Sequence, residues 1–424
     1  MSDELRYVWV QDAGVDPSLR RPDEPSLEES LLVLSQSLIS EPSEEWNAAL
    51  DSAEGQHPFT KARTTVAGGS LSPFKALWTS RSAALIALHE SYLPMIDLLI
   101  PRFYVPVLLP STPLPFVPVP SSAIDRVINL IKTLKFSDQI SIAVNSISLP
   151  QMLNDIRFLT GEDKRSTILT RHSFSTGALT AAAWLSDRFE ETGAKCGLKK
   201  FSEDYAPNVI CRYPSLVNTT ETVILSAHYD SRGSWGSTRA PGGNDDGSGT
   251  VSLLGIARTI LRKKIEFKAN VELVAFAGEE QGLVGSRAYA KELRDADADI
   301  TLMIQADMIA YHSPSEPQQL GLPEYIGTPE VATLLTNISS LYAPNLYVGP
   351  TRACCSDHQS FHQQGFPATQ VFERAGWILD PMYHNSGDLS NRTGYDLEQV
   401  KSIAKVTFAT LLHAAGFEMP AEGV

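Results

Sequence analysis

Adjacent acidic residues are the first feature of the sequence that could carry chemistry. The stretch GGNDDGSG places Asp245 and Asp246 side by side, among small residues that let the backbone turn sharply. The stretch FAGEEQG places Glu279 and Glu280 together in the same way. Neighbouring carboxylates repel each other unless a cation or a proton compensates their charge. These two pairs therefore predict a site that holds a cationic partner.

Metal-ligating residue types occur in five separate short stretches. Two imidazoles with three carboxylates suit borderline ions such as zinc, and a carboxylate can bridge two ions. A carboxylate shared between two cations stays charged beside another carboxylate, which explains the NDDGSG stretch. The candidate ligands are His228 in AHYD, Asp245 in NDDGSG, Glu280 in FAGEEQG, Asp307 in IQADM and His384 in PMYHNSGDLS.

The apolar runs indicate which elements position these residues. Strand-like runs such as TVILSAHYD, ANVELVAFAGEE and DITLMIQADM alternate with helical patterns, among them 149–160 and 176–192. This alternation predicts an α/β fold, a three-layer sandwich with a mixed, centrally parallel sheet flanked by helices. Ligands bind at the carboxyl ends of the strands in such sheets, and the polar residues fall there.

A change of pattern near residue 122 predicts two parts. Residues 123–424 carry the α/β pattern, whereas residues 1–122 form an N-terminal helical and proline-rich extension. Helices are expected in PSLEESLLVLSQSLI and over residues 75–100. The apolar run 103–123 contains six prolines, which exclude a membrane helix. We expect a helical cap, with an inhibitory or removable pro-segment as the alternative.

Charge and short motifs bear on partners and location. The formal net charge of −14 argues against a nucleic-acid partner, because no basic face is available to neutralise phosphates. The N-terminus MSDELRYVWV has no signal-peptide pattern. Glycosylation sequons start at Asn218, Asn337 and Asn391 and favour a secreted glycoprotein whose signal peptide is not in this chain. An intracellular protein is the alternative.

Four cysteines leave their pairing open. Cys196 and Cys211 flank a hairpin-like stretch, CGLKKFSEDYAPNVIC, and either pair across it or remain two buried thiols. Cys354 and Cys355 are adjacent. A disulfide between neighbouring residues is strained, so we expect separate roles for these two.

Five motifs together resemble one protein family. SAHYDS, GGNDDGSG, FAGEEQGLVGSRAYA, IQADM and YHNSGDLS, in this order and spacing, resemble the M28 family of zinc aminopeptidases. The resemblance spans most of the chain after the N-terminal extension. It implies two Zn²⁺ ions per chain: Asp245 bridges both, His228 and Asp307 complete one site, and Glu280 and His384 complete the other.

The resemblance also implies a mechanism. Glu279 matches the general base that takes a proton from a metal-activated water and passes it to the leaving amine. Asp230 matches the carboxylate that orients His228, and the peptide bond after Asp245 is expected to be cis. The implied activity is hydrolysis of the N-terminal residue of peptides or proteins. A glutaminyl cyclase-like acyltransferase, a carboxypeptidase on the same fold and an inactive receptor ectodomain are the alternatives; the last should have lost ligands or the base, and none is missing.

Apolar residues near His384 indicate the substrate pocket. Tyr383, Phe372 and Trp377 are predicted to bind substrate, and an apolar pocket suggests a Leu-like first residue. Further candidates are Phe361, Ile378 and Met382, with burial in the core as the alternative. Some relatives carry a tyrosine before SDH that stabilises the oxyanion. This chain has Ala353 there, which leaves the metals alone, Tyr383 or Arg352 for that role.

Histidines outside the five motifs have other predicted roles. His358 and His362 have the i, i+4 spacing that can bind zinc on a helix, but the stretch lacks the glutamate of H-E-x-x-H. We expect structural roles for both, and a surface or core position for His89. The sequence leaves open whether His312 lies near the site.

Overall fold

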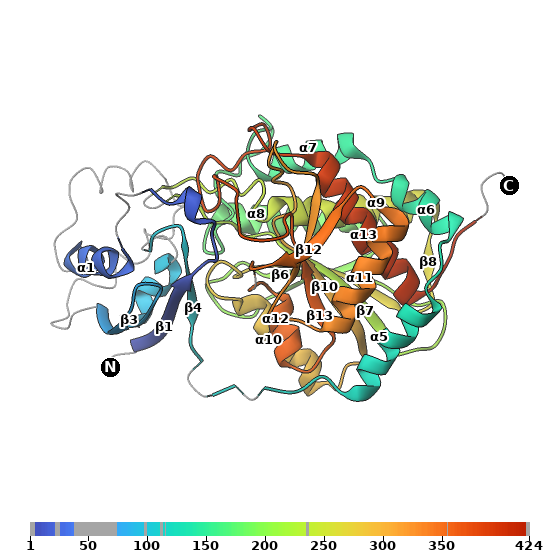
Figure 1. Ribbon diagram of the computed structural model, residues 1–424, viewed down its shortest axis with the longest axis horizontal. Helices are drawn as coiled ribbons and strands as arrows, with labels where there is room; N and C mark the ends of the chain where they lie inside the picture. The colour runs from blue at the N-terminus through green and yellow to red at the C-terminus, as the bar shows by residue number, and fades with distance from the viewer. Residues whose placement is uncertain are drawn as a thin grey trace.

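The computed structural model describes residues 5–21, 26–37, 74–96, 100–110, 113–114, 116–234, 237–353 and 355–420. These residues form a small N-terminal sheet beside a larger α/β part (Figure 1). Among them, no helix has the length and apolar character needed to cross a membrane.

A six-stranded sheet with the order β13-β10-β7-β9-β6-β5 forms the centre of the α/β part. Strands β13, β10, β7 and β9 run parallel, while β6 and β5 join antiparallel at one edge. This confirms the predicted mixed, centrally parallel sheet. The strands are β5 (Lys195–Lys199), β6 (Asn208–Tyr213), β7 (Thr222–His228), β9 (Asn270–Phe276), β10 (Ile300–Ala306) and β13 (Ala368–Val371).

Helices cover both faces of this sheet and complete the three layers (Figure 1). Alternate residues of β7 show the two faces. Leu225 packs into the core that contains residues of α8, α9 and α13, and Ile224 packs with Tyr289 of α10 and Phe361 of α12. The helices are α5 (Ser121–Thr133), α6 (Asp138–Asn145), α7 (Leu149–Leu159), α8 (Thr176–Glu190), α9 (Gly247–Lys263), α10 (Val284–Asp295), α11 (Pro329–Tyr342), α12 (His358–Gln363) and α13 (Leu397–Ala415).

Burial on both faces explains why the central strands read as continuous apolar runs. All seven residues of β7 are buried, and β10 is buried throughout as well. Two short pairs complete the part: β11 (Gln319–Pro323) with β12 (Tyr347–Thr351), and β8 (Glu266–Phe267) with β14 (Phe417–Glu418). The helices expected over 149–160 and 176–192 are confirmed as α7 and α8.

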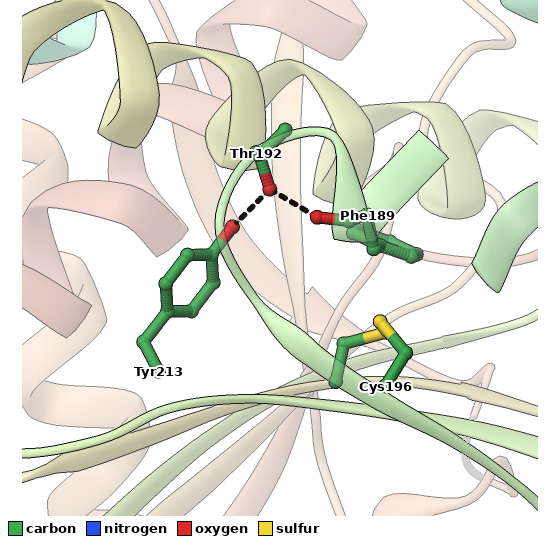
Figure 2. The surroundings of a disulfide bond; sticks show 5 residues. Phe189, Thr192, Cys196 and Tyr213 are labelled. Carbon is green, nitrogen blue, oxygen red and sulfur yellow. Dashed lines mark hydrogen bonds between the residues drawn. A yellow bond between two sulfur atoms is a disulfide. The ribbon is translucent and has the colours of Figure 1, made fainter. Parts of the chain in front are cut away.

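The edge pair β5–β6 carries a disulfide between Cys196 and Cys211, which are direct partners in the register. The disulfide alternative of the sequence analysis is therefore the one found. Figure 2 shows its surroundings: the Thr192 hydroxyl donates to the Phe189 carbonyl at 2.6 Å and lies 2.5 Å from the Tyr213 hydroxyl. These contacts tie the end of α8 to the same edge.

The second cysteine prediction concerns the adjacent residues Cys354 and Cys355. Cys355 is disulfide-bonded, and it has no free thiol. The sequence predicts separate roles for Cys354 and Cys355 and does not predict a disulfide at Cys355. Cys354 lies outside the described residues.

The N-terminal part is a four-stranded antiparallel sheet with the order β2-β3-β1-β4. The helix predicted over residues 75–100 is wrong, because that segment forms a strand pair followed by a 3₁₀ turn. The helix predicted in PSLEESLLVLSQSLI is confirmed as α1. The elements are β1 (Leu5–Asp12), a 3₁₀ turn (Pro17–Leu19), α1 (Leu27–Ser37), β2 (Phe74–Thr79), β3 (Ala83–His89), a 3₁₀ turn (Glu90–Met95) and β4 (Tyr104–Leu108).

The loop after β1 joins this sheet to the α/β part. The Asp16 amide donates to the Ile378 carbonyl at 2.8 Å, and the Ile378 amide donates to the Gly14 carbonyl at 3.2 Å. Val15 and Phe103 share a buried cluster with Phe372, Ile378 and Tyr383. The N-terminal sheet therefore packs over the residues that follow β13. The division into 1–122 and 123–424 stays a prediction, although α5 begins at Ser121.

Candidate metal centre

The candidate ligands come from segments that meet at the carboxyl ends of the parallel strands. His228 is the last residue of β7, and Asp307 directly follows β10. Glu280 follows β9 in the next loop, and Asp245 precedes α9. His384 lies in the long loop between β13 and α13. Three neighbouring parallel strands and two loops thus bring the predicted residues together at the carboxyl ends of the strands, as expected for this class of fold.

The five residues form two buried clusters that share Asp245. His228, Asp245 and Asp307 form one, and Asp245, Glu280 and His384 form the other; in each, one potential ligand atom per residue lies within 4.8 Å of the others. His228 Nε2 is 3.3 Å from Asp245 Oδ1 and 3.6 Å from Asp307 Oδ1. His384 Nε2 is 3.2 Å from both Asp245 Oδ2 and Glu280 Oε2. The two oxygens of Asp245 therefore face different histidines.

The donor atoms in these clusters fit a pair of divalent cations. His228 Nε2 and Glu280 Oε1 are buried and have no hydrogen-bond partner in the described part of the chain. Buried polar atoms are almost always satisfied, and a bound cation would satisfy these two. Two imidazoles and three carboxylates match the nitrogen and oxygen donors that zinc takes.

The pKa values of two carboxyl groups also indicate a site for a cation. Burial, together with the negative charges of Asp307 and Glu280, raises the pKa of the Glu279 carboxyl well above its ordinary value. Burial and the charge of Asp245 raise the pKa of Glu280. So many carboxyl groups cannot all ionise in a buried site without positive charge, and a bound cation would supply it.

Asp230 links His228 to the loop that carries Glu279 and Glu280. Its Oδ1 is 3.4 Å from His228 Nδ1, on the side of the ring away from the cluster. Its Oδ2 accepts from the Ser173 hydroxyl at 3.0 Å and from the Glu280 amide at 3.2 Å. One carboxylate thus lies behind the imidazole and holds the acidic loop, a position that suits the predicted role of orienting His228.

Glu279 lies beside the clusters without belonging to either. Its Oε2 is 4.0 Å from His228 Nε2, and it is absent from both metal-ligand groups. A carboxylate near the ligands but outside them is free to accept a proton. This position suits the predicted general base.

Three buried groups that the sequence analysis did not assign hold the Asp245 loop. Asp388 accepts from the amides of Asn244 and Asp245, at 2.9 and 3.0 Å. Arg171 donates to the carbonyls of Pro241 and Gly242. Asp246 caps α9 through the Gly249 amide at 2.9 Å, and its peptide bond with Asp245 is cis as expected. Asp388 could have been predicted from the sequence, because it belongs to the YHNSGDLS motif. No local sequence pattern predicts the role of Arg171.

A cavity of about 220 Å³ opens onto the clusters. It is lined by the predicted substrate-binding residues Phe372, Trp377 and Tyr383, together with Ile378. Among the further candidates, Phe361 does not reach it: this side chain is fully buried in the core against α10. Met382 does not line it either.

The residues weighed for the oxyanion also line this cavity. Ala353 is present, and the Tyr383 ring stacks on His384 with centroids 3.7 Å apart. The Arg352 guanidinium lies 4.5 Å from the centre of the Trp377 ring and 3.7 Å from Glu324. Tyr383 is therefore adjacent to a candidate ligand, whereas Arg352 contacts Trp377 and Glu324.

The other histidines weighed in the sequence analysis lie outside the two clusters. His358 is fully buried, and its Nε2 is 3.3 Å from the Ile326 carbonyl; burial lowers its pKa to about 3. His362 packs against Phe116. His312 contacts Asp396 at 3.0 Å and does not reach the site. His89 is the last residue of β3 in the N-terminal sheet.

Comparison with known proteins relates the region that holds both clusters to one family. Residues 208–410 match the model of peptidase family M28. A probable leucine aminopeptidase of Arthroderma otae is 29% identical over 290 residues, covering 65% of this chain and 76% of that protein.

Solved structures show the same fold. The Legionella pneumophila LapA aminopeptidase aligns with a TM-score of 0.64 and 17% identity, covering 99% of this chain and 100% of that one. A glutaminyl cyclase of Fimbriiglobus ruber aligns with a TM-score of 0.53 and 17% identity over 66% of this chain and 97% of its own. All five residues of the two clusters fall within the region that matches peptidase family M28.

Proposed function

We propose that the protein is a two-zinc aminopeptidase that removes an apolar, Leu-like residue from the N-terminus of peptides. The observation that carries this proposal is the sharing of Asp245. Its Oδ1 faces His228 and its Oδ2 faces His384, and each histidine brings a second carboxylate. A carboxylate between two ligand sets of this kind is the arrangement that a bridged metal pair requires.

Each side chain has a defined task in this proposal. Zn²⁺ ions, when bound, supply the Lewis acidity that activates water and polarises a carbonyl. Asp245, His228 and Asp307 would hold one ion, and Asp245, Glu280 and His384 the other. Glu279 accepts the proton of the attacking water and returns it to the nitrogen of the leaving amine. Asp230 keeps the His228 ring oriented throughout.

The hydrogen-bond acceptors of the site favour the amino end of a peptide. Four carboxyl groups line the cavity, namely those of Asp245, Glu279, Glu280 and Asp307. Two bound Zn²⁺ ions would offset their charge, so the preference rests on hydrogen bonding and not on net charge. A free α-amine can donate to carboxylate oxygens, whereas a C-terminal carboxylate has no hydrogen to donate. This supports an aminopeptidase over a carboxypeptidase.

The nature of the first residue follows from the cavity wall. Phe372, Ile378 and Tyr383 present apolar surface beside the clusters. A relative named probable leucine aminopeptidase supports the same preference. We therefore expect Leu-, Met- or Phe-like first residues to be cleaved fastest.

The test is hydrolysis of leucyl-p-nitroanilide beside its N-acetylated form, with a glutaminyl substrate in parallel. We expect cleavage of the free-amine substrate and loss of cleavage on acetylation. Equal hydrolysis of both forms would falsify the aminopeptidase assignment. Cyclisation of the glutaminyl substrate, with about one metal per chain, would instead support the acyltransferase alternative.

A further inference from the structure

Two cavities meet at Glu279. The first contains four of the five candidate ligands and has a volume of about 220 Å³. The second, of about 260 Å³, is lined by Glu279 but by none of the candidate ligands. If the proposed function holds, the residue whose carbonyl is attacked occupies the first cavity. The leaving amine takes its proton from Glu279, so the second cavity lies on the side of the leaving group.

The N-terminal sheet forms a wall of the second cavity. Trp9 and Gln11 of β1 line it, as do Val105 and Val107 of β4. Gln11 and Val105 line the first cavity as well. The sheet therefore covers the point where the scissile bond would lie, and it limits the room for peptide beyond that bond.

One cation lines the second cavity. Among the described residues around it, Arg287 of α10 is the only basic one. Its Nη1 donates to the Leu108 carbonyl at 3.0 Å, which anchors the side chain against the end of β4. Its Nε is buried and has no hydrogen-bond partner in the described part of the chain. A guanidinium has five N–H donors, and only Nη1 makes a hydrogen bond among the described residues, so Arg287 has donor capacity to spare in the cavity that it lines.

The covalent geometry of a dipeptide brings its carboxylate to this region. Its carboxylate carbon is only two bonds from the leaving nitrogen, through N–Cα and Cα–C bonds of about 1.46 and 1.52 Å. Because Glu279 must contact that nitrogen, the carboxylate lies close to Glu279 and is repelled by it. A guanidinium in the same cavity offsets this repulsion and donates charge-assisted hydrogen bonds.

We propose that the second cavity is the subsite for the C-terminal residue of a dipeptide, and that Arg287 binds its α-carboxylate. The preferred substrates are then dipeptides with an apolar first residue and a free C-terminus. In a longer peptide this position carries a neutral amide, and the following residues must pass the wall formed by β1 and β4. This inference names the substrate class of the proposed aminopeptidase and rests on it.

The test compares leucyl-alanine with leucyl-alanine amide and leucyl-trialanine on the metal-loaded full chain. The acid form of the dipeptide should have a kcat/KM about tenfold or more above the amide, the usual value of a hydrogen bond to a charged group. Arg287→Gln should reduce the ratio of acid to amide towards one. Arg287→Lys should keep part of it, because it retains the charge but not the planar fork.

Arg294→Gln is the matched control, since Arg294 lies seven residues further along α10 and lines neither cavity. It should leave the ratio unchanged. Equal rates on acid and amide in the wild-type chain would overturn the inference, as would an Arg287→Gln variant with an unchanged ratio. No cleavage of any of these peptides or of leucyl-p-nitroanilide would instead reject the proposed function itself.

Discussion

The Nδ1 atom of His384 lies 2.8 Å from the backbone carbonyl of Arg102, although 282 residues separate the two. The Arg232 Nη1 atom lies 3.0 Å from the same Nδ1, so two groups hold this side of the ring while Nε2 faces Asp245 and Glu280. The Arg232 guanidinium secures the same segment by donating to the carbonyls of Ile100 and Tyr104. The N-terminal part therefore helps to hold the His384 ring in the orientation that points Nε2 at the cluster.

The hydrogen bonds of Arg232 to the Ile100 and Tyr104 carbonyls predict that this residue supports metal retention. Arg232→Met should loosen the segment around Arg102 and weaken metal binding about 10–100-fold, the usual effect of losing an outer-shell partner. The measurement is the zinc released to a competing chelator, with thermal unfolding of the metal-free protein to check the fold. Arg239→Met, at an exposed position, is the control. Unchanged chelator competition in the Arg232 variant would show that the N-terminal part does not support the metal site.

A second prediction separates the base from the ligands. Glu279→Gln should keep both metals and the fold, because Glu279 lies outside both clusters. Its rate on leucyl-p-nitroanilide should drop by about 10²–10⁴, the usual contribution of general acid–base catalysis. Elemental analysis should still find about two zinc ions per chain. Substantial activity in this variant would remove Glu279 from the mechanism.

Asp245→Asn should behave differently from Glu279→Gln. The shared carboxylate belongs to both clusters, so the loss of its charge should release metal as well as activity. The ratio of zinc to protein after gel filtration measures this. A variant that is inactive but holds as much zinc as the wild type would contradict the bridging role of Asp245.

The sequence could predict the site because its chemistry follows local strands. His228 and Asp307 fall where apolar runs end, and those ends coincide in a parallel sheet. The N-terminal sheet was not predictable in this way. Residues 83–89 read AALIALH, and their Ala and Leu content favours a helix. They form a strand between β2, which pairs with them as a hairpin, and β1, which pairs with them across more than 70 residues of sequence. No local pattern encodes the second pairing.

Location is a further prediction. We propose that the protein passes through a secretory pathway. Asn218, Asn337 and Asn391 are all exposed, so their sequons are accessible to glycosylation, and a disulfide is compatible with an oxidising compartment. Protein expressed in a eukaryotic host with a secretory leader should lose mass on deglycosylation. An unchanged mass would leave the three asparagines incidental and favour the intracellular alternative.

The disulfide at the sheet edge should matter for stability and not for the metal centre. Cys196 and Cys211 are separated by 15 residues, and closing a loop of that size stabilises a fold by about 3 kcal/mol. A double replacement, Cys196→Ser with Cys211→Ser, should therefore lower the free energy of unfolding by about this amount, as measured by urea denaturation. Chemical reduction is the less selective experiment, because Cys355 is also disulfide-bonded and lines the first cavity.

The strands that deliver His228 and Asp307 are β7 and β10, whereas β5 is the outermost strand at the far edge. Zinc content and the rate on leucyl-p-nitroanilide should consequently match the wild type at temperatures where the variant is folded. A loss of zinc in the folded variant would show that the edge of the sheet is coupled to its centre.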